Sequence, residues 1–267
     1  YETLDLVEGK AEFALLIRPD IYPVEVIRRI KAKSQHLVGY QWDGLKRFPT
    51  VKLNIPLFDR FYVFDASDLP DADGSNIHFA TNFYFDLPRL MMHSRPNKIP
   101  VLYYVGAYNE KRVAEIKGFL KLVRPYNLIE KIFIIDSKRS ASPEVQNRPL
   151  NYEENLQFAG HADIILDISL RVHNGLSFRV FESICYEKKL ITNIKDVKYF
   201  DFYHPDNIFI LEAGEEPRLP DFLSTPYKKL ESAIKEKYSF SNWINYLLEI
   251  IPFQSIDAPI ACRNVNQ

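Results

Sequence analysis

The feature that most constrains this chain is a succession of short apolar runs that alternate with helix-like segments. Each run is continuous rather than alternating in polarity, and polar or turn-forming residues follow it. The runs lie at residues 13–17, 36–40, 61–64, 76–79, 100–105, 131–135, 162–167, 189–192 and 207–211. Continuous apolar strands of this kind are typical of parallel sheets whose two faces are both covered by helices. We therefore expect an α/β fold assembled from βαβ units.

Helices are expected between several of these runs. In residues 23–34, for example, Val24, Ile27 and Ile30 share one face, which is the spacing of an amphipathic helix. The series of strands and helices stops near the polar, proline-containing residues 94–98 and then starts again. The other expected helices lie at residues 110–123, 177–186 and 227–251, the last with a loop near 239–241.

Length and repetition together predict two domains. A chain of 267 residues exceeds the usual size of one domain. We expect two Rossmann-like, doubly wound domains that face each other across a cleft, at residues 1–97 and 98–267, with the C-terminal helix in the second. The sequence begins at Tyr1 without a methionine, so our expectation includes an N-terminal domain that is incomplete. Ligands of such domains bind at the carboxyl ends of the strands, where candidate site residues are therefore sought.

Composition and motifs exclude several classes of protein. The 34 Lys and Arg residues nearly cancel the 35 Asp and Glu residues, so no surface for nucleic acid is expected. No apolar stretch approaches the ~20 residues of a transmembrane helix and no signal peptide is visible, so we expect a cytoplasmic protein. The sequence lacks the phosphate loop GxxxxGK(S/T), the dinucleotide fingerprint GxGxxG and the nucleophile elbow GxSxG. Cys185 and Cys262 are too few for a disulfide scaffold or a four-cysteine zinc site.

One group of candidate residues follows the strand at 100–105. Gly106 comes directly after it, and Tyr108 and Arg112 lead into the first turn of the next helix. A glycine there lets backbone N–H groups approach a phosphate, and the helix N-terminus adds positive potential. Arg112 can neutralise a further charge. A plain strand-to-helix turn is the alternative.

A second group precedes and opens the helix at 177–186. Asn174 and Gly175 form a turn signal, and Arg179 and Glu182 lie three residues apart on one helix face. A buried carboxylate can accept hydrogen bonds from two ribose hydroxyls, while Arg179 can fork onto a pyrophosphate. A surface salt bridge between Arg179 and Glu182 is the alternative. Lys189, at the next strand, can add a cation or belong to a solvated turn.

Metal ligands are weakly represented. No histidine pair has the spacing of a helical zinc site. Asp71 and Asp73 form an Asp-x-Asp pair of the kind that can hold Mn²⁺ or Mg²⁺ against a sugar diphosphate. They lie in a turn-rich loop, so a solvated loop is the preferred interpretation and no metal is expected.

Several stretches carry a resemblance to a known family. They read YQWDG (40–44), FDRFYVFD (58–65), YVGAY (104–108), NGLSFRVFE (174–182), KKLITN (188–193), YHPDNI (203–208) and YSFSNW (238–243). As an ordered set covering nearly the whole chain, they resemble bacterial lipopolysaccharide and capsule biosynthesis glycosyltransferases of the GT-B type. Family members usually begin with an additional strand and helix, which would precede Tyr1 here.

The resemblance implies a transferase that moves a sugar from a nucleotide-activated donor to a growing glycan. It implies that the C-terminal half holds the donor, with Glu182 at the ribose and Gly106, Tyr108, Arg112 and Arg179 around the phosphates. Such enzymes stabilise the leaving phosphate with basic side chains and helix N-termini, so neither a metal nor another cofactor is expected.

An inverting reaction would also need a base from the N-terminal half. Asp43, which follows a strand end, is the first candidate, and Asp20 is the second. A turn-forming role before Gly44 is the alternative for Asp43.

The expected partners are a nucleotide-sugar donor and a glycan or lipid-linked glycan acceptor. Lipid-linked acceptors lie at the inner face of the cytoplasmic membrane, which leaves peripheral membrane contact open. Lys228, Lys229, Lys235 and Lys237 can meet anionic lipid or form a solvated helix face. Other functions remain open: another nucleotide-sugar enzyme such as an epimerase, a non-catalytic nucleotide- or glycan-binding module, and a scaffold of a membrane assembly complex.

Overall fold

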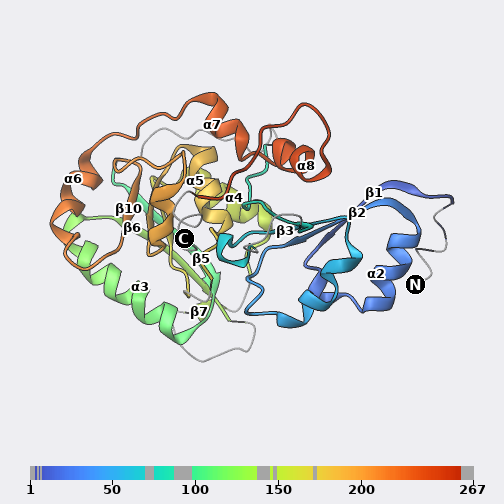
Figure 1. Ribbon diagram of the computed structural model, residues 1–267. Coiled ribbons are helices and arrows are strands. Elements are labelled where there is room, and N and C mark those ends of the chain that lie inside the picture. Colours follow the sequence, from blue (N-terminus) through green and yellow to red (C-terminus); the bar gives the residue numbers. More distant parts are fainter. Residues whose placement is uncertain are drawn as a thin grey trace. The chain divides into compact units, whose positions relative to one another are not determined.

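The computed structural model describes residues 4, 6, 8–69, 75–86, 98–136, 145–146, 149–170 and 173–259. The chain divides into two compact units, each built from more than one stretch of sequence. Each unit contains one parallel sheet with helices packed on it (Figure 1). Unit 1 comprises Tyr1–Asn82, Val172–Leu176 and Glu236–Gln267, and unit 2 comprises Phe83–Arg171 and Ser177–Lys235.

The sheet of unit 1 has four parallel strands in the order β1-β2-β3-β4. The strands are β1 (Ala11–Ile17), β2 (Ser34–Gln41), β3 (Arg60–Val63) and β4 (Ile77–Phe79), and α2 (Val24–Ala32) connects β1 to β2. Ile27 of α2 is fully buried in a core that includes Leu37 and Phe61. The strand order runs in one direction, without a reversal among the described strands. Short 3₁₀ helices fill the connections: η1 (Pro19–Ile21), η2 (Pro49–Leu53), η3 (Ile55–Leu57) and η4 (Ala66–Asp68).

The C-terminal helix α8 (Phe240–Leu248) belongs to unit 1. The ring of its Trp243 meets the ring of Tyr40 edge-on, with 4.9 Å between the centroids. The indole Nε1 donates a hydrogen bond of 2.9 Å to the carbonyl of Thr81, and the Tyr246 hydroxyl donates one of 3.0 Å to the carbonyl of Phe79. The sequence places this helix in the C-terminal domain. The structure differs because the aromatic face of α8 is buried on the first sheet.

A short loop from the middle of the chain also packs in unit 1. The backbone N–H of Asn174 donates to Asp65 Oδ2 at 2.8 Å, and Asn82 Nδ2 donates to the carbonyl of Leu176 at 2.9 Å. Gly175 lies against the ring of Phe64, so closely that a Cβ atom at Gly175 would come within 2.3 Å of the ring. The loop therefore belongs to unit 1 up to Leu176, and the chain enters unit 2 at Ser177, the N-cap of the helix that begins at Phe178.

The sheet of unit 2 has six parallel strands in the order β10-β9-β8-β5-β6-β7. The order starts in the middle with β5, grows outward on one side and then on the other, which is the doubly wound Rossmann arrangement that the sequence predicts. The reversal falls between β5 and β8. The strands are β5 (Val101–Ala107), β6 (Ile129–Ile135), β7 (Val145–Gln146), β8 (Ile164–Asp167), β9 (Lys189–Thr192) and β10 (Ile208–Ile210).

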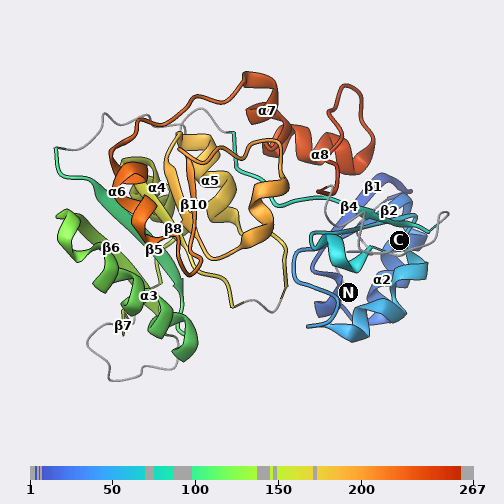
Figure 2. The ribbon, with the colours of Figure 1, turned by 60° about the vertical axis from the view of Figure 1, so that its left-hand side comes forward.

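Helices cover both faces of this sheet (Figure 2). Leu102 and Tyr104 of β5 face α3 (Glu110–Val123) and α6 (Leu219–Ser224), in one core with Phe119 and Phe222. Tyr103 points to the other face, because successive strand residues alternate, and its ring stacks on Phe158 at 5.8 Å between centroids. That face carries α4 (Tyr152–His161) and α5 (Phe178–Tyr186). The remaining elements of unit 2 are η6 (Arg124–Tyr126), η7 (Lys195–Tyr199), η8 (Glu216–Arg218) and α7, which spans Ser232–Lys237 and enters unit 1 at its end.

The structure confirms each strand expected from the sequence, and the helices expected at 23–34, 110–123 and 177–186. The expected helix at 227–251 is two shorter helices, α7 and α8, with no helix over 227–231. The helices α4 and α6 and the short strand β7 are additions that the sequence pattern does not predict. The linker expected at 94–98 lies outside the described residues except for Lys98.

Replacing Gly175 by alanine tests whether the loop is held in unit 1. We expect Gly175→Ala to lower the free energy of unfolding by about 1–3 kcal/mol, because the new methyl group overlaps the Phe64 ring. Gly118→Ala is the matched control: Gly118 lies in α3, and nothing lies within 4 Å of the position that a new methyl group would occupy, so that change should stabilise by about 0.5–1 kcal/mol. Urea unfolding measures both. Equal effects of the two changes would contradict the close packing at Gly175.

Candidate functional site

The candidate site lies at the carboxyl edge of the unit 2 sheet, where the strand order reverses. Ligands of doubly wound sheets bind at this point, outside the carboxyl ends of the two strands that flank the reversal. Here those strands are β5, which ends at Ala107, and β8, which ends at Asp167. The residues that form this edge all belong to unit 2.

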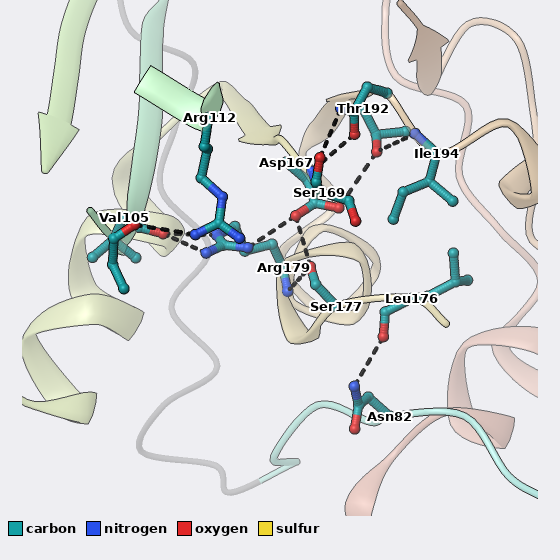
Figure 3. Close-up of polar contacts among 12 residues, drawn as sticks. Asn82, Val105, Arg112, Asp167, Ser169, Leu176, Ser177, Arg179, Thr192 and Ile194 are labelled. Atoms are coloured by element: carbon teal, nitrogen blue, oxygen red, sulfur yellow. Dashed lines mark hydrogen bonds and ion pairs between the residues drawn. The ribbon is translucent and has the colours of Figure 1, made fainter. Parts of the chain in front are cut away.

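Asp167 is the centre of the polar contacts at this edge (Figure 3). Its side chain is 1% exposed, and its Oδ1 atom accepts hydrogen bonds from Ser177 Oγ at 2.8 Å and from Arg179 Nη1 at 2.9 Å. The hydroxyl of Thr192, at the end of β9, lies 3.4 Å from Oδ2. Ser177 is the N-cap of α5 and also accepts from the backbone N–H of Arg179. Asp167 therefore ties the start of α5 to two strands.

Each side-chain nitrogen of Arg179 bonds to a protein group. Its Nε and Nη2 atoms donate to the carbonyl of Val105 at 2.8 and 2.5 Å, and Nη1 pairs with Asp167. The guanidinium lies 5.2 Å from the centroid of the Tyr104 ring. The alternative of a surface salt bridge with Glu182 is not what the structure contains, because Arg179 forms its ion pair with Asp167. The structure brings Arg179 to the predicted edge, where each of its three side-chain nitrogens already donates to a protein group.

Two other donors at the same edge lack a well-formed hydrogen bond. The hydroxyl of Tyr104 and the Nε atom of Arg112 are buried without a bond of good geometry among the described residues, although the Arg112 side chain lies close enough to the phenol oxygen to oppose the rise in the Tyr104 pKa. Arg112 lies in the first turn of α3, and its Nη1 atom donates to the carbonyl of Ala107 at 3.1 Å. Burial raises the pKa of Tyr104, so its phenol stays protonated and remains a donor. Buried polar groups are nearly always satisfied, so two unsatisfied donors beside the end of β5 point to an acceptor that binds there.

Gly106 is a glycine because these groups crowd the end of β5. A Cβ atom at Gly106 would lie 2.3 Å from the Tyr104 hydroxyl and 3.1 Å from Arg179 Nη2. Tyr108 follows at the edge: its backbone N–H donates to the carbonyl of Ile135 at 2.8 Å, and its side chain is exposed. Gly106, Tyr108, Arg112 and Arg179 thus gather as the sequence predicts, although their contact with a phosphate stays a prediction.

Glu182 lies one turn further along α5 and is almost fully buried. Its Oε1 atom accepts a hydrogen bond of 3.0 Å from Asn155 Nδ2, and Asn155 Oδ1 accepts one of 2.9 Å from the hydroxyl of Tyr103. The pKa of Glu182 is raised, chiefly because the carboxyl group is buried. The charge of Arg179 and the hydrogen bond from Asn155 act in the opposite direction and reduce this rise.

Sequence reasoning misses both Asp167 and Asn155. In the sequence Asp167 is only the end of a strand. Asn155 lies on α4, which begins with a capping box: Asn151 accepts from the backbone N–H of Glu154, whose carboxylate accepts from the backbone N–H of Asn151. The spacing Asn-x-x-Glu is visible in the sequence and is the signal that could have predicted this helix start.

Three predicted donor-binding residues lie elsewhere. Lys189 is the first residue of β9 and so lies at the amino edge of the sheet, opposite the reversal, where its amine donates to the carbonyl of Phe222. Asn174 and Gly175 belong to the loop of unit 1, where Asp65 and Phe64 account for their contacts. Lys189 is therefore not part of this edge, and contact of Asn174 and Gly175 with a donor stays a prediction.

The two candidate bases lie in unit 1 and share one arginine. Arg18 Nε and Nη2 donate to the two oxygens of Asp20 at 2.7 and 2.6 Å, and Arg18 Nη1 lies 3.2 Å from Asp43 Oδ2. Asp43 also pairs with Arg47 at 2.9 Å. Burial is the largest single effect and by itself would raise the pKa of Asp20, but the hydrogen bonds from Arg18 and Gln41 and the charge of Arg18 together lower that pKa. Arg18 adopts a left-handed backbone conformation (φ 58°), a strained state for a non-glycine residue.

Metal and membrane features are few in the part of the chain that the structure describes. No group of three or more His, Cys, Asp or Glu side chains there could hold a metal ion. Asp71 and Asp73 lie outside the described residues. Among the helices that are described, none is long and apolar enough to cross a membrane.

Comparison with solved structures finds a similar fold. The structure titled "lipopolysaccharide outer core galactosyltransferase WaaB apo form" matches 93% of this chain and 77% of its own, with a TM-score of 0.52 and 13% sequence identity. No family model and no curated protein matches the sequence. The likeness confirms the expected GT-B class of fold with its two Rossmann-like domains, and the neighbour is a transferase of the kind that the sequence motifs resemble.

The role of Asp167 can be tested by removing its charge. Asp167→Asn leaves the largely buried Arg179 without its counter-ion, and we expect a loss of about 3 kcal/mol in the free energy of unfolding. Asp221→Asn, on the exposed first turn of α6, is the control and should change stability by less than about 1 kcal/mol. Chemical denaturation of both variants measures the difference. A loss below about 1 kcal/mol for Asp167→Asn would show that the pair does not hold this edge together.

The pairing of Asp20 predicts a pH dependence. Its folded-state pKa lies below the unfolded value of about 3.9, so its contribution is fully present above that value and is lost as the pH falls through the folded pKa. The difference in unfolding free energy between wild type and Asp20→Asn should therefore be constant near neutrality and shrink between about pH 5 and pH 3. Urea titrations across that range measure it. A difference that does not vary with pH would remove the ionic role of Asp20.

Proposed function

We propose that this chain is a glycosyltransferase that moves a sugar from a nucleotide-activated donor to a glycan acceptor during assembly of a bacterial surface polysaccharide such as lipopolysaccharide or capsule. Its fold is similar to that of a galactosyltransferase of the lipopolysaccharide outer core, and its ordered motifs resemble the same class of enzyme. In this proposal unit 2 binds the donor nucleotide.

The observation that carries the proposal is the pair of unsatisfied donors at the reversal of strand order. The hydroxyl of Tyr104 and Nε of Arg112 are buried without a hydrogen bond of good geometry among the described residues, and the lack of a side chain at Gly106 lets the Tyr104 hydroxyl lie directly beside the backbone. Arg112 adds a full positive charge, and it stands in the first turn of α3, a helix of 14 residues whose N-terminus carries positive potential. Two donors, a cation and a helix N-terminus suit the phosphate groups of a nucleotide sugar.

The same groups would assist the reaction. When the bond from the anomeric carbon to the donor phosphate breaks, negative charge develops on the leaving phosphate, and preorganised donors stabilise it. The Asp167–Arg179 pair holds the neighbouring start of α5 in place, so these donors need not rearrange. We propose that no metal is required, because a cation and a helix end already serve this charge.

The acceptor hydroxyl must lose a proton as it bonds to the anomeric carbon. Asp43 remains the first candidate base for an inverting reaction. Asp20 is less suited, because Arg18 occupies both of its oxygens and lowers its pKa. A carboxylate of lowered pKa accepts a proton less readily.

The proposed place of action is the cytoplasm, where nucleotide sugars are made, with peripheral contact to the inner membrane face if the acceptor is lipid-linked. Of the tail lysines, Lys235 forms an ion pair with Glu187 at 3.2 Å. Lys228 and Lys229 are the better candidates for contact with anionic lipid.

Nucleotide binding is the experiment that tests the function. We expect UDP, GDP, ADP or CMP to raise the melting temperature of the protein, with or without EDTA, because a ligand that binds the native state stabilises it. Arg112→Gln should weaken the affinity for the active nucleotide at least tenfold in titration calorimetry. Lys111→Gln is the matched control, since Lys111 is exposed on the same turn of α3, and it should change the affinity less than threefold.

Three outcomes would count against parts of the proposal. If none of the four nucleotides binds, the donor assignment is wrong. Saturable binding without hydrolysis of the corresponding nucleotide sugar would favour the non-catalytic module. The ion pairs of Arg18 with both candidate bases, Asp20 and Asp43, also favour that module. Loss of binding in EDTA would return Asp71 and Asp73 to consideration as metal ligands.

A further inference from the structure

The carboxylate of Glu182 has a neighbour with no assigned role. Glu182 is 3% exposed, and a carboxylate removed from water needs hydrogen-bond donors to remain ionised. Asn155 Nδ2 supplies one at 3.0 Å from the adjacent helix α4. Glu182 and Asn155 therefore face each other across the contact between α4 and α5, within unit 2 alone.

A third residue determines which end of the Asn155 amide faces Glu182. The hydroxyl of Tyr103 donates to Asn155 Oδ1 at 2.9 Å, which leaves the NH₂ group directed at the carboxylate. The Tyr103 ring packs against two aromatic neighbours, Phe158 at 5.8 Å and Phe133 at 6.0 Å between centroids. The strand β5 thus fixes the phenol, the phenol orients the amide, and the amide holds one oxygen of the carboxylate.

We propose that Asn155 is a positioning residue for the sugar of the donor nucleotide: it holds Glu182 in the orientation from which the carboxylate accepts hydrogen bonds from the ribose hydroxyls. The inference rests on the proposed function, because it assumes a nucleotide in unit 2. It goes further in assigning part of the recognition to the chain Tyr103–Asn155–Glu182. Without the Asn155 amide, Glu182 loses this hydrogen bond and turns toward other partners or takes up a proton.

The affinity ratio between ribo- and dideoxynucleotides separates this role from a structural one. UDP, GDP, ADP and CMP are compared with their 2′,3′-dideoxy counterparts, which keep the base and the phosphate groups but lack the hydroxyls. We expect the wild type to bind one ribonucleotide at least tenfold tighter than its dideoxy form. Asn155→Leu and Glu182→Gln should each reduce that ratio to less than about threefold, mainly by weakening ribonucleotide binding. Loss of packing alone would weaken both forms equally and leave the ratio unchanged.

Further variants guard against a folding defect. Asn155→Asp keeps the size of the side chain and the hydrogen bond from Tyr103, but it places an oxygen instead of the NH₂ group against Glu182. It should therefore also reduce the affinity ratio to less than about threefold. Tyr103→Phe should reduce it partly, since the amide is no longer oriented. Asn207→Ser is the matched control: Asn207 is a buried amide of unit 2 that bonds both backbone groups of Lys228, and its loss should leave the ratio intact.

The outcomes distinguish the inference from the proposed function. If the wild type binds none of UDP, GDP, ADP and CMP, the donor assignment fails and the inference with it. If it binds with a ribose preference that Glu182→Gln removes but both Asn155 variants keep, the function stands and the role of Asn155 is overturned. If Glu182→Gln still prefers the ribonucleotide, the Glu182 carboxylate does not bind the ribose hydroxyls, and the inference is overturned.

Discussion

The ion pair between Asp167 and Arg179 is the interaction on which the candidate site depends. It joins the end of β8 to the first turn of α5, while the other nitrogens of Arg179 bind the carbonyl of Val105 in β5. The pair therefore spans the two strands between which the order of the sheet reverses. A buried charge is tolerable only when it is paired and hydrogen-bonded, and here each partner has at least two polar contacts. The geometry of the edge follows from satisfying these two charges.

This arrangement divides the work among the basic residues. Arg179 is committed to the framework, while Arg112 and the Tyr104 hydroxyl keep buried donors unused among the described residues. Groups that are already oriented before a ligand arrives stabilise charge without the cost of reorganisation. The acidic side of the site is built in the same manner, since Glu182 is oriented by Asn155 rather than by solvent. The residues that would touch the donor and the residues that position them are thus different.

Neither unit is a continuous piece of sequence. Unit 1 needs α8 from the end of the chain, whose Trp243 is fully buried against Tyr40, and it also holds the loop that immediately precedes α5. Truncating the chain before α8 would expose the aromatic face of the first sheet. A contiguous fragment that ends before α8 would therefore lack part of the core of unit 1, whereas residues 83–235 contain all of unit 2.

The strands, the main helices and the division into two α/β units follow from the sequence alone, because continuous apolar runs and amphipathic periodicity are local properties. The sequence also locates Gly106, Arg112, Arg179 and Glu182, since ligand sites of parallel sheets follow strand ends. Which of these residues has its N–H groups bonded to the protein depends instead on three-dimensional packing. The partners of Arg179 are Val105 and Asp167, which other strands supply, and the first residue of β9 lies at the opposite edge although it is near Arg179 in sequence. The placement of α8 likewise arises from burial between distant segments, which no local pattern encodes.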